Sequence, residues 1–532
     1  MIYEKYFQKD FDEIVKSKNK NIKHLLNDKN YLISGDFYGI QKFIFEGLST
    51  TKASQVLRAK SAFVQIFTNY IAKYICYKLE ISEEYILSSN AGKFEIISPK
   101  NFDLSKIQEE INEYFLKNFY GLSGVSICNV EFEACCATTT IRMRKRVSIC
   151  NVEFEGKDFH KKEKYRELRD KISKEVEKQK YKKFDLVNEK NYVLEYDKNI
   201  NNQNLCKICN IRKITDKNCD ICNMFVQLGK DLVKREQTIY SSKDLGLNFD
   251  GFETKIVIDK KLKSYVKKDK FDTPMTFENL AKNSCQEIDT GIEALAVLKA
   301  DVDSMGNFLK DSDVTDNFEN FDCFSKTLDN FFSLYVPKLM REKYPYTYTI
   351  FAGGDDLFLV GAWDEVLELA REIHKEFKKF IKNKLSISFG IAIAKPSHPI
   401  SHLADYTEEL LEEAKGIDTN KNAISLFRET VKWKSYLETY EKLKEIFDEI
   451  EDKDINTSFL YRLLEVIELS KKVKYEDDIL STIWKSKLSY SFARNMDKKY
   501  FDILGKLSKE IENNPSETKM FLSEYIYKRR DK

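Results

Sequence analysis

One segment restricts the fold of this chain more than any other, the run from Tyr346 to Trp363, YTYTIFAGGDDLFLVGAW. Its apolar, β-branched and aromatic residues predict two short strands. Between them, Gly353 and Gly354 suit a tight hairpin turn because glycine accepts positive φ. Asp355 and Asp356 follow directly, and adjacent carboxylates repel each other unless a cation offsets their charge. The hairpin is therefore predicted to carry a metal-binding turn.

A second acidic pair lies upstream, at the end of another predicted strand. The apolar run 294–300 leads into Asp301, Val302, Asp303 and Ser304. Carboxylates from a strand end and a neighbouring hairpin can hold two divalent cations, activate a ribose hydroxyl and position a triphosphate for in-line attack. Taken singly, GGDD could be only a hairpin turn and DVDS only a helix N-cap. Their order, with a helix between them, favours the catalytic interpretation, in which Asp301 joins the two turn carboxylates.

Composition excludes several classes of protein. The 532 residues suggest about three or four domains, and a net charge of +2 gives no global signature of a free nucleic-acid-binding protein. No apolar run reaches the roughly 18 residues that a membrane span needs. The N-terminal sequence MIYEKYFQKDFDEIVKSKNK is not that of a signal peptide. We expect a cytoplasmic protein without a membrane partner, whose reduced cysteines bind metal or fill apolar space.

The same order of elements is predicted in both halves of the chain. In the first half, strand, helix, hairpin, helix and strand fall at 31–34, 56–79, 85–98, 104–119 and 125–133. In the second half they fall at 294–300, 318–342, 346–362, 364–383 and 385–394. This β-α-β-β-α-β order is the ferredoxin-like palm pattern. The predicted fold class is therefore α+β, with two palm domains related by internal duplication.

The two predicted hairpin turns differ in chemistry. The first reads Asn90-Ala91-Gly92-Lys93 in place of GGDD. Because lysine cannot hold a metal as aspartate does, we expect the first palm to bind nucleotide or to support the other palm.

A nine-residue sequence, VSICNVEFE, occurs twice in the first palm, at 125–133 and again at 147–155. Only one copy can fill the last sheet position, so the other copy and the intervening 134–146 are expected to form a loop or an addition at a sheet edge. The basic residues of that loop could alternatively contact nucleic acid; they are Arg142, Arg144, Lys145 and Arg146.

Two CxxC motifs follow a Lys/Glu-rich helix predicted at 160–187. Nine residues separate the first motif, Cys206 and Cys209, from the second, Cys219 and Cys222. This spacing in a reduced protein predicts a four-thiolate zinc site. With four cysteine ligands the shell is closed, so the zinc is expected to be structural. A redox role would need a single CxxC beside a thioredoxin-like unit.

The chain continues past the second palm. A helix predicted at 402–414 ends at Lys415, which could reach a triphosphate or simply favour the helix C-terminus. A strand is predicted at 423–427. From 431 onward the apolar 3.6-residue period predicts a bundle of about four to six helices that serves as a packing or partner surface.

These features together resemble one family, the large polymerase–cyclase (palm/GGDD) subunit of type III CRISPR effector complexes, closest to the Csm-type form of subtype III-A. The motifs that carry the resemblance are GDFYGIQKFIF at 35–45, LRAKS at 57–61, NAGKF at 90–94, the cysteine motifs at 206–222, ADVDSMG at 300–306, FAGGDDLFLV at 351–360, AKGIDTNKN at 414–422 and TSFLYRLL at 457–464. The implied domains are a helical leader at 1–30, a first palm at 31–159, a linker and zinc domain at 160–289, a second palm at 290–428 and a helical domain at 429–532.

The resemblance implies an activity and partners. Target-RNA binding by the complex would switch on the second palm, which would join ATP into cyclic oligoadenylates with Mg²⁺ or Mn²⁺. The partners implied are guide RNA, target RNA and other type III subunits, namely the one that binds the guide 5′ end and a small helical one. Asp301, Asp355 and Asp356 would hold the metals. The implied nucleotide-binding residues are Gly353, Gly354, Val302, Asp303, Ser304, Met305, Gly306 and Lys415 in the second palm, and Ser34, Asp36, Ser61, Gly92 and Lys93 in the first.

The sequence departs from the family in one respect. Many members begin with an HD nuclease domain, and no His-Asp dipeptide occurs in this sequence. We therefore expect cyclase activity without HD-type DNase activity. The alternatives left open are a scaffold subunit of the guide-RNA complex, a diguanylate-cyclase-like enzyme that uses GTP, and an enzyme that joins ATP to S-adenosylmethionine.

Overall fold

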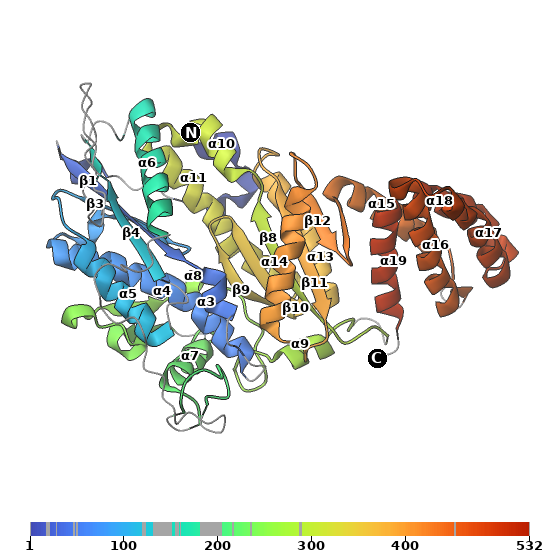
Figure 1. The fold of residues 1–532 in the computed structure, drawn as a ribbon, viewed down its shortest axis with the longest axis horizontal. Helices are drawn as coiled ribbons and strands as arrows, with labels where there is room; N and C mark the ends of the chain where they lie inside the picture. Colours follow the sequence, from blue (N-terminus) through green and yellow to red (C-terminus); the bar gives the residue numbers. More distant parts are fainter. Residues whose placement is uncertain are drawn as a thin grey trace.

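Two sheets backed by helices lie side by side in the body of the molecule, and a group of helices projects from one end (Figure 1). The computed structural model describes residues 2–17, 22–27, 29–45, 48, 52–119, 124–130, 152–154, 159, 161–180, 205–214, 217–234, 237–286, 290–451 and 454–530. No helix in these ranges is long and apolar enough to cross a membrane.

The first sheet has the strand order β2-β3-β1-β4, with every neighbouring pair antiparallel. This is the order that the β-α-β-β-α-β pattern predicts. Its elements are β1 (Asn30–Tyr38), α3 (Ile40–Phe45), α4 (Ala53–Leu79), β2 (Ile86–Asn90), β3 (Lys93–Ser98), α5 (Ser105–Phe119) and β4 (Gly124–Val130). The predicted elements are therefore all present, with boundaries that differ by a few residues.

The duplicated nine-residue sequence contributes to the sheet through both copies. The first copy forms β4, which pairs with β1 from Leu32 to Tyr38. The end of the second copy forms β5 (Val152–Phe154), which pairs with β1 from Asn30 to Leu32. Of the two alternatives expected for the second copy, a loop or an addition at a sheet edge, the described part of it shows the addition, because β1 extends beyond the part that β4 covers. Residues 134–146, with the proposed basic loop, lie outside the described residues.

The second sheet has the order β13-β12-β11-β8-β10-β9. Its last four strands repeat the order of the first sheet. The elements are β8 (Leu295–Val302), α10 (Met305–Asp311), α11 (Phe318–Asn330), α12 (Val336–Lys343), β9 (Thr347–Gly353), β10 (Asp356–Ala362), α13 (Trp363–Phe380), β11 (Ile387–Ala394), α14 (Ile400–Gly416), β12 (Ala423–Leu426) and β13 (Glu429–Lys432). Strand β13 was not predicted.

The helix predicted at 318–342 is divided. A π-helical turn, Phe331–Tyr335, lies between α11 and α12. Pro337 follows this turn and has no N–H to continue an α-helical ladder. The helix therefore shifts its register at a position that periodicity alone does not mark.

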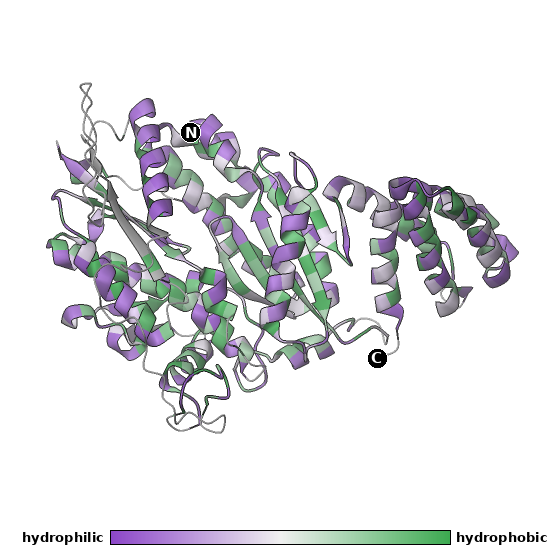
Figure 2. Cartoon of the chain, in the orientation of Figure 1, coloured by the Kyte–Doolittle hydropathy of each residue, from purple (hydrophilic) through white to green (hydrophobic). Residues whose placement is uncertain are grey.

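Alternating residues of β8 belong to two separate cores. Ala296, Leu298 and Ala300 pack with α11 and α13 on one face, whereas Leu295 and Val297 belong to the core that includes α14 and the first sheet. Figure 2 shows the strands of this sheet as mainly hydrophobic and the surrounding helices as mixed. Asp301, by the same alternation, lies on the α14 side.

Side chains of α3 join the two halves of the chain. Gln41 donates to Glu408 of α14 at 3.1 Å, and Glu408 also pairs with the buried Lys299 of β8. The rings of Phe45 and Phe358 lie 4.7 Å apart. The GDFYGIQKFIF motif thus forms part of the interface between the halves.

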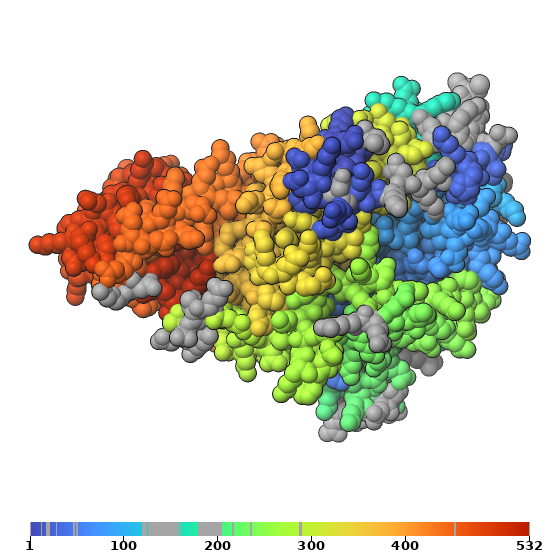
Figure 3. Space-filling model, turned by 180° about the vertical axis from the view of Figure 1, so that it is seen from behind, coloured from blue at the N-terminus to red at the C-terminus, as the bar shows by residue number. Residues whose placement is uncertain are grey.

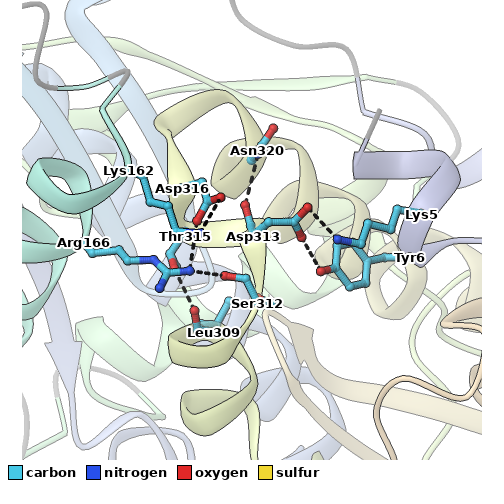
Figure 4. A network of polar contacts seen from close by, with 10 residues as sticks. All are labelled: Lys5, Tyr6, Lys162, Arg166, Leu309, Ser312, Asp313, Thr315, Asp316 and Asn320. Atoms are coloured by element: carbon cyan, nitrogen blue, oxygen red, sulfur yellow. Dashed lines mark hydrogen bonds and ion pairs between the residues drawn. The ribbon is translucent and has the colours of Figure 1, made fainter.

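The N-terminal residues pack on the second sheet's helices. Helix α1 (Ile2–Tyr6) reaches the 3₁₀ turn η8 (Asp313–Asp316), where Lys5 pairs with Asp313 at 2.7 Å (Figure 4). From the other side, α6 (Lys162–Lys180) pairs Arg166 with Asp316 at 2.9 Å. Figure 4 shows the turn held between these two helices, which lie far apart in sequence.

The remaining elements are the cysteine region and the C-terminal helices. Helix α7 (Asp220–Asp231) begins within the second CxxC motif, includes Cys222 and packs on α4. The C-terminal helices form one end of the space-filling view (Figure 3). They are α15 (Trp433–Asp448), α16 (Thr457–Glu476), α17 (Trp484–Asn495), α18 (Phe501–Asn513) and α19 (Pro515–Arg529), with a core of their own. Arg371 of α13 makes a bidentate ion pair with Glu524 of α19, at 2.9 and 3.1 Å.

Candidate active site

Three carboxylates converge where β8 meets the β9–β10 hairpin. Strands β8 and β10 are antiparallel, and their register places Asp356 directly opposite Asp301. Each of Asp301, Asp355 and Asp356 offers an oxygen within 4.8 Å of the others. The backbone N–H of Val302 donates to the carbonyl of Asp355 at 3.3 Å, which ties the strand end to the turn. The structure therefore brings together the residues that the sequence predicted as metal ligands.

The electrostatics of this cluster fit a divalent cation. Burial, and then the charge of Asp356, raise the pKa of Asp301 to about 8, although Lys415 acts in the opposite direction. Burial and the charge of Asp356 also raise the pKa of Asp355. Carboxylates directly opposite each other in a sheet destabilise it. A cation would remove this repulsion, so the donor set suits Mg²⁺ or Mn²⁺.

Two lysines supply positive charge to the cluster from different directions. Lys415, near the end of α14, pairs with Asp301. Burial lowers the pKa of Lys415, but the charge of Asp301 outweighs this effect and raises it overall. Lys93, at the start of β3 in the first sheet, lowers the pKa of Asp355 through its charge, against the effect of burial. The cluster thus receives a cationic group from each half of the chain.

The two hairpin turns face each other. A Cβ added to Gly353 would lie 3.1 Å from the Cβ of Ala91, in the turn of the first sheet. Gly354 has φ of +65°, which favours glycine, and its own added Cβ would lie 3.6 Å from the same methyl group. Both glycines therefore contribute to the close approach of the turns.

The residues between β8 and α10 lie at differing depths. Asp303 is buried, and its carboxylate accepts from Ser386 Oγ at 2.7 Å and from the N–H of Asn422 at 3.0 Å. Ser304 occupies the N-cap position of α10 with φ of +54°, but its side chain makes no cap bond, so the motif does not stabilise the helix start through this hydroxyl. Met305 and Gly306 begin α10, and Gly306 is exposed.

The predicted nucleotide-binding residues of the first sheet are more dispersed. Ser34 and Asp36 are buried on β1, and Ser61 is buried on α4. Gly92 has φ of +84°, and its carbonyl accepts from the N–H of Phe37 at 2.8 Å. Of these predicted residues only Lys93 has an interaction with the carboxylate cluster in the described contacts.

The four cysteines of the CxxC motifs form a second cluster. Their sulfur atoms lie within 4.8 Å of one another and all four residues are buried. Cys209 Sγ and Cys219 Sγ are 4.0 Å apart, near the roughly 3.8 Å that tetrahedral zinc with bonds of about 2.3 Å requires. Hydrogen bonds from its neighbours lower the pKa of Cys209, which favours the thiolate. The cluster fits a structural zinc ion.

Sequence reasoning missed the residues that hold the GGDD turn in place. Asp329, at the end of α11, accepts from the N–H of Gly354 at 3.0 Å and pairs with Lys261 at 2.7 Å. Arg58, buried on α4, donates to the carbonyls of Leu262 and Ile350. Arg58 belongs to the LRAKS motif, which marked the segment but not this role. No sequence signal distinguished Asp329 from the other acidic residues of its helix.

The topology and the cluster together define a palm protein of the nucleotide-cyclase-like type. Comparison with family models agrees, since residues 294–425 match the second palm domain of Cas10/Cmr2. Residues 29–136 match domain B of the Csm1 subunit. The resemblance to the large subunit of type III CRISPR complexes is thereby confirmed.

Individual relatives point to the same subtype. The chain is 26% identical to the single-strand-specific deoxyribonuclease Cas10/Csm1 (subtype III-A) of Methanocaldococcus jannaschii, over 86% of the chain and 68% of that protein. It is 25% identical to the Streptococcus thermophilus protein of the same name, over 82% of the chain but only 59% of that protein. The chain therefore spans about three fifths to two thirds of these relatives.

Solved structures show the same fold. A Csm1–Csm4 subcomplex of the type III-A CRISPR-Csm interference complex superposes with a TM-score of 0.68 at 21% identity, covering 95% of this chain and 70% of that one. A Csm1–Csm4 cassette in complex with cA4 gives 0.67 at 20% identity, covering 94% and 70%. The predicted α+β class and the presence of a palm domain are confirmed. Whether HD-type DNase activity is absent stays a prediction.

Proposed function

We propose that this chain is a nucleotidyltransferase that joins ATP into cyclic oligoadenylates, with Asp301, Asp355 and Asp356 as the ligands of two divalent cations. The observation that carries the proposal is the convergence of these three carboxylates within 4.8 Å. Cations held there would activate a ribose 3′-hydroxyl and stabilise charge on the attacked α-phosphate as pyrophosphate leaves.

The chain's own residues would prepare the site for a triphosphate. Gly353 and Gly354 present backbone without a Cβ, so a phosphate can approach the turn closely. The ammonium group of Lys415 forms an ion pair with the carboxylate of Asp301. Binding of cations to the Asp301 carboxylate would release the ammonium of Lys415 to contact phosphate oxygens. Lys93, in the opposite turn, would contact phosphate oxygens from the other side.

The domain assignment is part of the proposal. The first palm, at 31–159, would support the nucleotide but would not carry out the chemistry, because its turn carries Lys93 where the turn of the second palm carries aspartate. The cysteine region at 160–289 would be a zinc domain, 290–428 the catalytic palm, 429–532 a helical domain and 1–30 a leader. The shared strand order of the two sheets supports the duplication.

The solved relatives support the choice of substrate and setting. Csm1–Csm4 cassettes have been solved with one ATP, with pppApA and with cA4. We extend this to the present chain: ATP as substrate, linear oligoadenylates as intermediates, and a Csm4-like subunit, guide RNA and target RNA as partners. Because the chain spans only part of its relatives, a DNase activity stays outside the proposal.

The test is product analysis after the assembled complex is incubated with target RNA, ATP and Mg²⁺ or Mn²⁺. Cyclic oligoadenylates are expected, and GTP or ATP with S-adenosylmethionine should give no comparable product. Asp355→Ala with Asp356→Ala should abolish synthesis while the complex still assembles. Asp311→Ala, which removes an exposed carboxylate on α10, is the control and should retain activity. Continued synthesis by the double variant would refute the assignment.

A scaffold role has an observation of its own. Ile479, Leu480 and Ile483 in the C-terminal helices are 79%, 86% and 54% exposed. Exposed apolar groups of this kind mark protein–protein contacts. We propose that this end of the molecule binds another subunit, which is compatible with catalysis. Ile479→Asp should weaken complex assembly without changing zinc content, and unchanged assembly would oppose the role.

A further inference from the structure

Helix α14 lies across one face of the second sheet, and contacts with two of its strands fix it there (Figure 1). In the middle of β11, a Cβ added to Gly390 would clash with the backbone of α14, so the helix and the strand touch directly. On β8, Lys299 pairs with Glu408 and Asp301 pairs with Lys415. Of these contacts, only the last involves a residue of the proposed metal cluster.

The two ion pairs follow the periods of the two elements that they join. Lys299 and Asp301 are two residues apart on β8, so both side chains lie on the face that α14 covers. Glu408 and Lys415 are seven residues apart on α14, almost two helical turns, so both lie on the face toward the strand. The helix is therefore held to β8 at two points, roughly 10 Å apart along its axis.

Lys299 is a buried charge with an apolar neighbour. The residue is 5% exposed, and the register of the sheet places the buried Phe358 of β10 directly opposite it on one side and Gly390 of β11 on the other. Removing an ammonium group from water is costly, so a buried ion pair is a poor source of stability, but it selects which side chains meet. The pair of Lys299 with Glu408 therefore sets the position of α14 along β8.

The carboxylate of Glu408 also contacts the first half of the chain. Gln41 of α3 donates through Nε2 to Glu408 Oε2 at 3.1 Å, and the same oxygen accepts from the ammonium of Lys299. Helix α3 packs against α14 at this point. The first half of the chain thus contacts α14 at the residue that sets the position of α14 on β8.

We propose that Glu408 is a positioning residue that keeps Lys415 beside the metal cluster during the proposed synthesis. The inference rests on the proposed function, in which cations bind the carboxylate of Asp301 and release Lys415 to phosphate. At that step α14 loses its ion pair with Asp301. Among the described ion pairs, the one between Glu408 and Lys299 then still joins α14 to β8. The ammonium of Lys415 therefore stays at the triphosphate, and Gln41 makes its position depend on α3.

The first test is a double-mutant cycle on the assembled complex with target RNA, ATP and Mg²⁺. Glu408→Ala should lower kcat/KM for ATP roughly tenfold, because the ammonium at the triphosphate is no longer held in place. In a Lys415→Ala background the same change should have little further effect, since the group that Glu408 positions is gone. Glu409→Ala removes an exposed carboxylate from the same helix and should match the parent. Equal losses in both backgrounds would overturn the proposal.

The second test does not depend on activity. Amide hydrogen exchange in α14 is followed by mass spectrometry on the full chain, with and without saturating Mn²⁺. In the parent, Mn²⁺ should leave exchange at 408–416 nearly unchanged, because Glu408 still holds the helix. In Glu408→Ala, Mn²⁺ should speed this exchange by roughly threefold or more, because both ion pairs to β8 are then lost. The same response to Mn²⁺ in the parent and in the variant would overturn the proposal.

Thermal melting checks the folding of each variant. Glu408→Gln keeps the shape of the side chain and removes its charge, so it should act in the same direction as Glu408→Ala and replaces it if the alanine variant does not fold. If the parent complex makes cyclic oligoadenylates but the two losses are additive, the positioning role fails and the proposed synthesis stands. If the parent makes no product, the proposed synthesis fails, and the exchange experiment alone decides whether Glu408 holds the end of α14.

Discussion

Asp329 accepts a hydrogen bond at 3.0 Å from the backbone N–H of Gly354, so a residue at the end of α11 holds the turn that presents the acidic pair. The other oxygen of Asp329 pairs with Lys261 at 2.7 Å. Asp329 is 6% exposed, and both oxygens of its carboxylate have partners. This makes Asp329 a positioning residue for the turn and links the turn to the segment that contains Lys261.

Removing this support should slow the proposed reaction. We expect Asp329→Ala to lower kcat roughly 10–100-fold with little change in KM for ATP, because small displacements of reacting groups are costly while the binding surface remains. Asp329→Asn keeps an acceptor for Gly354 and should lose less. Steady-state pyrophosphate release by the complex measures both.

The control for Asp329 is on the same helix. Asp322→Ala breaks a buried ion pair with Lys326 and leaves the turn untouched. If Asp322→Ala lost as much kcat as Asp329→Ala, the effect would be one of helix stability and the positioning role would be rejected.

The cysteine cluster should contain about one zinc ion per chain. Cys209→Ser should abolish zinc binding and lower the melting temperature, because a structural zinc site contributes directly to folding. Metal content by mass spectrometry and a thermal melt are the measurements. Cys323→Ser changes a buried cysteine outside the cluster and should keep the zinc. A purified chain with no zinc would contradict the prediction.

The ion pair between Arg371 and Glu524 should stabilise the junction of the second sheet with the C-terminal helices. The charge of Arg371 outweighs burial and lowers the pKa of Glu524 to about 2. Glu524→Gln would leave a buried guanidinium without its partner, which costs about 3–5 kcal/mol. Urea denaturation measures the loss.

The exposed pair of Lys485 and Glu512 gives the comparison for Glu524. Glu512→Gln should change stability by less than about 1 kcal/mol. In the parent chain, the contribution of Glu524 is present above its ordinary pKa of about 4.5 and is lost as the pH falls towards 2. A similar small effect for both variants would show that the buried pair is not stabilising.

His374 should make the folded state sensitive to mild acid. Its folded pKa of about 4 lies below the ordinary value of 6.5, so protonation favours the unfolded chain. Stability is unaffected above pH 6.5 and should fall between pH 6.5 and 4, by up to about 3 kcal/mol. Thermal melts across this range should show a flatter profile for His374→Phe than for the parent. Replacement of the exposed His398 by Phe should leave the parent profile unchanged.

The sequence was informative where chemistry and spacing are local. The residue types of the turn from Gly353 to Asp356 and of the cysteines at 206–222 were enough to predict two metal-binding clusters. In the structure the members of each cluster lie close to one another. The strand order of both sheets follows from the order of elements, because the palm pattern leaves few ways to pair the strands. Lys415 reached the cluster, although its spacing alone left a helix-end role equally open.

The parts that escaped prediction depend on tertiary neighbours. Asp329 and Lys261 are ordinary charged residues until α11 and the 260–263 segment meet behind the turn. The contacts of Asp303 and His374 with Asn422 join segments that are far apart in the sequence, which no periodicity encodes. Strand β1 pairs with both copies of the duplicated sequence because it is longer than the segment that pairs with β4, and its first residues pair with β5.

The contact of Ala91 with the glycine turn has a mechanical consequence. The methyl group of Ala91, from a turn without acidic residues, rests against the turn that carries Asp355 and Asp356. Any larger side chain at that position would push the acidic loop aside. A rotation of the first sheet relative to the second would therefore displace the carboxylates of Asp355 and Asp356. Under the proposed function, a movement of the first sheet would change the position of Asp355 and Asp356 through this one contact, and a larger residue at position 91 would block it.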